Sequence, residues 1–126
     1  MLHHLSIAVS DLARSARFYD AVLSTLGYRR VWTADSAIGY GIEDDKDKLA
    51  LKYRGAPVQA PSPGFHLALA APNREAVARF HELGLAHGGT DNGVPGLRAH
   101  YGPTYFAAFV IDPDGYALEA VCKDPS

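Results

Sequence analysis

The sequence predicts an α+β fold in which a β-α-β-β-β module occurs twice within one domain of 126 residues. Three observations support this. The order strand, helix, three strands appears in both halves of the chain, a segment rich in proline and glycine separates the halves, and the length suits one domain with an apolar core. We therefore expect module one over about 1–54, a linker over about 55–63 and module two over about 64–126.

Module one begins with a strand over residues 3–9, where apolar side chains alternate with small or polar ones. Ser10 is a suitable helix N-cap, apolar residues recur at helical spacing over 11–26, and Gly27 is the expected helix stop. Short runs that favour strands then occur at 28–33, 37–42 and 48–53.

Module two repeats the pattern with a strand over 65–71 and a helix that Asn73 caps. Residues 87–98 are rich in glycine, aspartate and asparagine, which predicts a loop. The remaining strands are expected at about 98–101, 105–111 and 116–121.

Composition excludes several classes of protein. A net charge of −2 argues against nucleic acid or an anionic membrane as partner, and the longest apolar runs are too short to cross a bilayer. The single cysteine, Cys122, excludes an internal disulfide framework. The N-terminus lacks a signal-peptide pattern, so we expect a cytoplasmic protein.

Three side chains stand out because of the strands that carry them. Glu119 lies within an apolar strand, where an ionised carboxylate is costly to bury without a cation or strong donors. His4 and His66 each lie on the small-residue face of the first strand of a module. Each alone reads as an ordinary polar residue, but modules related by a twofold axis would bring them to one cleft. We predict that the three residues bind one divalent metal ion, with Zn, Fe, Mn, Ni and Co all suited to these ligands.

Both ends of the sequence resemble one family. The run from His4 (His-Leu-Ser-Ile-Ala-Val-Ser-Asp-Leu) to Leu26-Gly27 is similar to the opening of the vicinal oxygen chelate superfamily, and Asp112-Pro-Asp-Gly-Tyr-Ala-Leu-Glu119 is similar to its closing motif. That superfamily includes glyoxalase I, fosfomycin-resistance, bleomycin-resistance and extradiol dioxygenase proteins. The resemblance implies paired modules that form an open, U-shaped mixed sheet around a central cleft, and a homodimer.

The resemblance also implies where a metal would bind. His4, His66 and Glu119 match three of the family's ligand places, and the fourth falls around Leu51 or Lys52. Neither residue can replace the expected carboxylate, because leucine has no donor atom and lysine is cationic. The remaining set of two histidines and one carboxylate is closer to the dioxygenase branch than to glyoxalase I.

Residues 98–105 are expected to face the cleft. His100 and Tyr105 could exchange protons with a bound substrate, and Arg98 could pair with a substrate carboxylate or phosphate. The alternative for the whole stretch is a polar strand and turn at the surface.

Two functions follow as expectations. The first is a metal-dependent enzyme of the lyase, isomerase or dioxygenase type, whose small oxygenated substrate chelates the metal. The second is a metal-free protein of the bleomycin-resistance kind, which binds or sequesters a small molecule in the same cleft.

Overall fold

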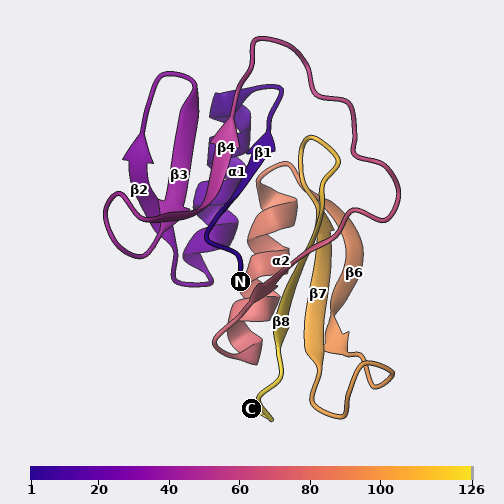
Figure 1. Cartoon of the computed structure of the whole chain (residues 1–126). Coiled ribbons are helices and arrows are strands. Elements are labelled where there is room, and N and C mark those ends of the chain that lie inside the picture. The colour runs from indigo at the N-terminus through magenta and orange to yellow at the C-terminus, as the bar shows by residue number, and fades with distance from the viewer. Residues whose placement is uncertain (126) are drawn as a thin grey trace.

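The predicted pair of modules is present in the computed structural model, which describes residues 1–125 (Figure 1). Module one consists of β1 (Leu5–Ala8), α1 (Leu12–Ser24), β2 (Arg29–Thr33), β3 (Ala37–Gly41) and β4 (Asp47–Lys52). Module two consists of β5 (Leu67–Ala70), α2 (Arg74–Ala86), β6 (Thr90–Leu97), β7 (Phe106–Ile111) and β8 (Ala117–Cys122). No helix in the described part of the chain is long and apolar enough to span a membrane.

Each module forms its own four-stranded mixed sheet. The strand orders are β1-β4-β3-β2 and β5-β8-β7-β6. In both sheets the first strand of the module runs parallel to the last one, and the other pairs are antiparallel. The first strands β1 and β5 therefore lie at sheet edges, each hydrogen-bonded on one side.

One apolar core joins the two modules. The helices pack against each other, and the inner faces of both sheets belong to the same cluster of buried side chains. Gly84 of α2 lies at this contact, where an added Cβ would be 3.2 Å from a methyl carbon of Val110 and 3.5 Å from one of Val22. Because the helices cover only the inner faces, the opposite face of each sheet is left without a helix.

The turn between β7 and β8 ties module two to the start of α1. The buried Asp114 carboxylate accepts hydrogen bonds from the backbone N–H of Ser10 and from Nη2 of Arg14, at 3.2 and 2.9 Å. Asp112, also buried, accepts a 2.5 Å hydrogen bond from the hydroxyl of Tyr19. These contacts fix the orientation of the modules within one chain.

Two helix starts test the predicted caps. Asn73 caps α2 as expected, with its side chain accepting from the N–H of Ala76. The cap of α1 is Asp11 and not Ser10, because the Asp11 carboxylate accepts from the N–H of Arg14. The Ser10 hydroxyl instead accepts from the N–H of Val58 in the linker, at 2.7 Å.

The predicted boundaries around residue 98 are wrong. Residues 90–97 form β6 and not a loop, and their register against β7 shifts twice. Glycine and proline are tolerated there because β6 is an edge strand. Residues 98–101 form a turn and not a strand, with the N–H of Tyr101 bonded to the carbonyl of Arg98.

Candidate functional site

Glu119 is buried on the helix-free face of the second sheet. Its neighbours in β8, Leu118 and Ala120, point into the core, so strand alternation turns Glu119 to the opposite side. In the sheet it lies beside Ala68 of β5 and Phe109 of β7. Glu119 is only 3% exposed, although no helix covers this face.

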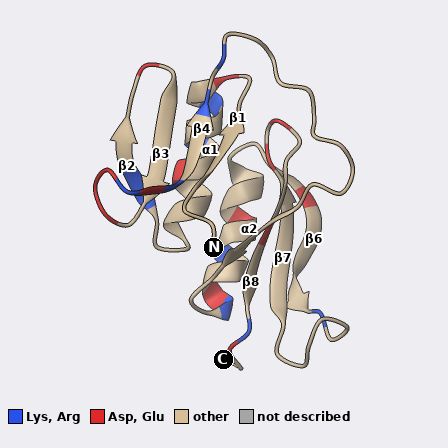
Figure 2. Cartoon of the chain, in the orientation of Figure 1, with Lys and Arg blue, Asp and Glu red and all other residues tan. Residues whose placement is uncertain are grey.

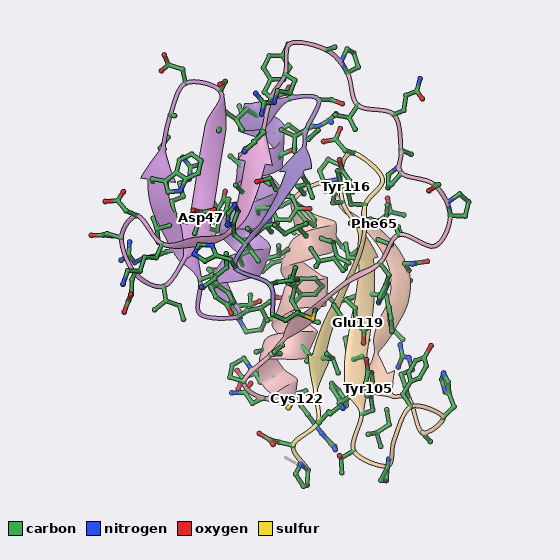
Figure 3. All side chains as sticks on the ribbon, in the orientation of Figure 1. Asp47, Phe65, Tyr105, Tyr116, Glu119 and Cys122 are labelled. Atoms are coloured by element: carbon green, nitrogen blue, oxygen red, sulfur yellow. The ribbon has the colours of Figure 1, made fainter. Side chains whose placement is uncertain are left out.

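Two side chains account for the burial of this carboxylate. Nε2 of His66 lies 2.6 Å from Oε1 of Glu119, and the hydroxyl of Tyr105 donates to Oε2 at 2.5 Å. Figure 3 shows Tyr105 and Glu119 on the second sheet. Burial, followed by the bond to Glu119, raises the pKa of Tyr105 to about 12. The phenol therefore keeps its proton at neutral pH and serves as a donor.

His4 lies apart from this pair. It is exposed, and its Nδ1 is 2.7 Å from Nδ1 of His3. Both histidines border a cavity of about 300 Å³, which Leu5 of β1 and the whole of β5 also line. Within residues 1–125, no three histidine, cysteine or acidic side chains are grouped to hold a metal ion. The structure thus brings together His66 and Glu119, two of the three expected ligands.

The two sheets locate the counterpart of Glu119 in module one. His66 precedes Ala68 by two residues, and Ala68 pairs with Glu119. His4 likewise precedes Ser6, which pairs with Ala50. The fourth ligand place of the resemblance therefore falls on Ala50 and not on Leu51 or Lys52. The expectation that no carboxylate occupies this place still holds, because alanine has no donor atom.

The remaining candidates lie on the loop between β6 and β7. Tyr105 contacts Glu119 as described, and its ring centroid is 5.2 Å from that of Tyr101. His100 is exposed and contacts Tyr101, with ring centroids 4.1 Å apart. His100 is thus linked to the carboxylate through two aromatic rings and not directly.

Phe109 is a site residue that the sequence reasoning missed. Its ring centroid lies 5.9 Å from that of His66 and 5.3 Å from Cζ of Arg98. The sequence offered one indication of this. Phe109 falls in the predicted strand 105–111, two residues after Ala107, so alternation places it on the same face as Tyr105. Without the pairing of β7 with β8, that face could not be matched to Glu119.

Comparisons with known proteins agree with this architecture. The family model described as Glyoxalase/Bleomycin resistance protein/Dioxygenase superfamily matches residues 1–120. A glyoxalase/bleomycin resistance protein from Albidiferax ferrireducens T118 is 31% identical, with a TM-score of 0.79 and 94% of each chain covered. A glyoxalase-related enzyme from Fulvimarina pelagi is 25% identical, with a TM-score of 0.72, and the match covers 96% of this chain and 86% of that one.

A more distant similarity concerns fold alone. A glyoxalase I mutant from Zea mays is 24% identical with a TM-score of 0.72, and the match covers 95% of this chain and 45% of the maize chain. A comparison with curated proteins finds no significant match.

Proposed function

Because the chain belongs to the glyoxalase/bleomycin resistance protein/dioxygenase superfamily, we propose that it is a metal-dependent enzyme acting on a small oxygenated substrate. In this proposal the substrate chelates a divalent ion, one of Zn, Fe, Mn, Ni or Co, beside Glu119. The reaction class is an isomerisation, a lyase reaction or a dioxygenation. The observation that carries the proposal is the buried Glu119 carboxylate with an imidazole 2.6 Å away on a helix-free sheet face.

The residues present fit such an ion in kind. Imidazole nitrogen and carboxylate oxygen are the ligands that these metals take in open catalytic sites. His66 is exposed while Glu119 is buried, so the pair offers one ligand anchored in the sheet and one that can reorient. When bound, the ion would polarise a substrate carbonyl or diol oxygen.

The third ligand is proposed to come from a second copy of the chain. His4 is exposed, and within residues 1–125 it is not grouped with His66 and Glu119 closely enough to hold a metal ion. A homodimer that places β1 of one copy beside the second sheet of the other would supply the missing imidazole. This extends the homodimer that the resemblance implies.

Tyr105 and His100 are proposed to handle protons. Tyr105 holds its proton at neutral pH and can donate it to a hydrogen bond with a substrate oxygen as well as with Glu119. The exposed imidazole of His100 lies on the same loop, and an imidazole nitrogen can accept or donate a proton. Neither residue needs to bind the metal for these roles.

Metal analysis of untagged protein tests the proposal. After incubation with Mn(II) and dialysis, we expect about one ion per chain in the wild type, and a loss of bound metal in His66→Ala because that variant lacks a ligand. His87→Ala is the matched control, since His87 is exposed and bonds to the carbonyl of Leu83. Equal metal in His66→Ala and wild type, or none in the wild type with any of the five ions, would overturn the proposal.

One observation favours the metal-free alternative. Both oxygens of Glu119 already have hydrogen-bond partners, His66 and Tyr105, so the carboxylate is satisfied without an ion. A protein of the bleomycin-resistance kind would then use the same face to bind a small molecule. In that case, ligand binding would persist in the presence of a chelator.

A further inference from the structure

We propose that Arg98 makes this site selective for substrates that carry a carboxylate group in addition to the metal-chelating oxygens. The inference rests on the proposed function and adds a substrate class to it. It depends on how the guanidinium is held, on what lies next to it, and on its lack of an acidic partner.

The guanidinium of Arg98 is fixed in place by uncharged groups. Its Nη2 donates to the backbone carbonyl of Val94 at 2.6 Å, and its Cζ lies over the ring of Phe109, 5.3 Å from the centroid. A cation stacked on an aromatic face and bonded once to a carbonyl keeps further N–H donors for a planar anion. Arg98 is half-buried, so part of the side chain remains in contact with solvent.

Two glycines of β6 leave room for this arrangement. A Cβ added at Gly93 would lie 3.3 Å from Nη2 of Arg98, and one added at Gly96 would lie 3.1 Å from Nη1. The Gly93 Cβ would also come within 2.8 Å of the Phe109 ring. A side chain at either position would crowd the guanidinium. Glycine at both positions therefore allows Arg98 to lie where it does.

Phe109 connects Arg98 to the proposed metal site. The same ring that receives Arg98 lies 5.9 Å from the ring of His66, and Phe109 is the β7 partner of Glu119. A single aromatic side chain thus separates the guanidinium from the proposed ligands. A substrate bound beside Glu119 would therefore extend past Phe109 to meet the guanidinium.

Arg98 has no acidic partner in the described part of the chain, and a second cation lies near Tyr105. Arg14, Arg29 and Arg30 each form an ion pair with an aspartate, whereas Arg98 forms none within residues 1–125. The Lys123 ammonium lies 5.9 Å from the ring centroid of Tyr105. Figure 2 shows blue segments just past the lower ends of β6 and β8, with a red segment following the one below β8. An arginine fork suits a carboxylate because both are planar and can form two parallel hydrogen bonds.

The test compares two matched diols. The probes are 3,4-dihydroxybenzoate and its methyl ester, which have the same diol ring but differ in the charge of the substituent. Dissociation constants are measured calorimetrically at pH 7 on full-length, Mn(II)-loaded protein, and metal content is recorded for each sample. We expect the wild type to bind the acid about tenfold more tightly than the ester, because a charge-assisted pair contributes about 1.4 kcal/mol or more.

The expected change is confined to one variant and one probe. Arg98→Gln should bind the acid and the ester with similar affinity, while its affinity for the ester matches that of the wild type. Arg79→Gln serves as the control, because Arg79 is exposed on α2, which covers the opposite face of the sheet. It should retain the full preference for the acid.

The contrary results are distinct. Equal affinity of the wild type for acid and ester, with Mn(II) bound, would overturn the role of Arg98 and leave the metal site standing. Equal loss of both probes in Arg98→Gln would also overturn it, because the residue would then support the site in general. A wild type that binds no metal would overturn the proposed function and this inference with it.

Discussion

Glu119 is a buried acid whose two oxygens are both accounted for by neighbouring side chains. Nε2 of His66 and the hydroxyl of Tyr105 each lie at hydrogen-bond distance, which offsets much of the cost of removing a carboxylate from water. His66 is the exposed member of the set, so under the proposed function it is the side chain that would exchange this bond for a metal or substrate. Tyr105 holds the other carboxylate oxygen.

The pKa of Tyr105 should report on Glu119. Burial is the main cause that raises this pKa to about 12, and the Glu119 carboxylate adds to it. In Glu119→Gln the charge is removed and burial remains, so the pKa should fall below 12 but stay above the ordinary value near 10. Ultraviolet difference titration of each protein against the same background with Tyr105→Phe isolates this tyrosine. An unchanged pKa in Glu119→Gln would contradict the hydrogen bond.

The alkaline stability has a definite sign. A folded-state pKa above the unfolded one means that neutral Tyr105 stabilises the fold fully below about pH 10. That contribution is lost as the pH rises through about 12.

At the scale of residues, the sequence predicts the pair His66 and Glu119 because both fall in runs with a clear alternation, although β5 begins one residue after His66. His4 follows the same alternation, yet the fold places it beside His3. The repeat shows that two strands are equivalent but does not show how far apart the fold sets them. Phe109 was hidden for a related reason, since an aromatic residue in an apolar strand is usually part of the core.

The turn between β7 and β8 adds polar contacts between the modules to those of the shared apolar core. Oδ1 of Asp112 accepts from the N–H groups of Asp114 and Tyr116, and its Oδ2 accepts from the Tyr19 hydroxyl. The hydroxyl of Tyr116 donates to the carbonyl of Ala8 at the end of β1. One short turn thus bonds to both α1 and β1, although about a hundred residues separate the turn from these two elements in the chain.

Removing the Asp112 side chain should be costly. Asp112→Ala leaves three donors without an acceptor in a buried place, so we expect the free energy of unfolding to fall by about 3 kcal/mol. Urea denaturation at pH 7 measures this, with Asp35→Ala as the control because Asp35 is exposed. A loss as small as that of the control would show that the turn does not hold the modules.

Asp112→Asn should show a pH dependence. Burial raises the pKa of Asp112, so the carboxyl is protonated in the folded state at pH values where the unfolded chain has already ionised it. The stability of the wild type therefore falls as the pH rises through this window. Asparagine does not titrate, so the destabilisation caused by Asp112→Asn should be larger at pH 4 than at pH 7.

At the scale of elements, the helices and most strands were predictable because their apolar spacing is regular. β6 was not, since its sequence Thr90–Leu97 contains two glycines and a proline. Those residues normally break a strand, and only the edge position beside β7 makes them acceptable. Which strand pairs with an edge strand depends on the tertiary structure and cannot be inferred from the local sequence.

At the scale of the whole molecule, β1 and β5 leave one edge each without a strand partner in the described chain. Both strands border the cavity of about 300 Å³ that also contacts His3 and His4. Open strand edges are templates for pairing with another chain, and an isologous pair of such chains would repeat every contact twice. In the proposed homodimer, such pairing would bring His4 of one copy towards the His66–Glu119 pair of the other.

Mixing two variants that each fail to bind metal should restore metal binding if the site is shared between two copies. His4→Ala and His66→Ala are each expected to lose Mn(II), because each lacks a ligand in every site of its own homodimer. When the two are unfolded and refolded together, a mixed dimer contains one site with both intact histidines and one with neither. Random pairing then gives about a quarter of the wild-type metal content, measured by elemental analysis after dialysis.

Refolding His66→Ala with Glu119→Gln is the control. Both changes lie in the same module, so no shared site in the mixed dimer has all three ligands and no metal binding is recovered. If the ligands instead come from one chain, neither mixture recovers metal, and the proposed exchange between copies is wrong.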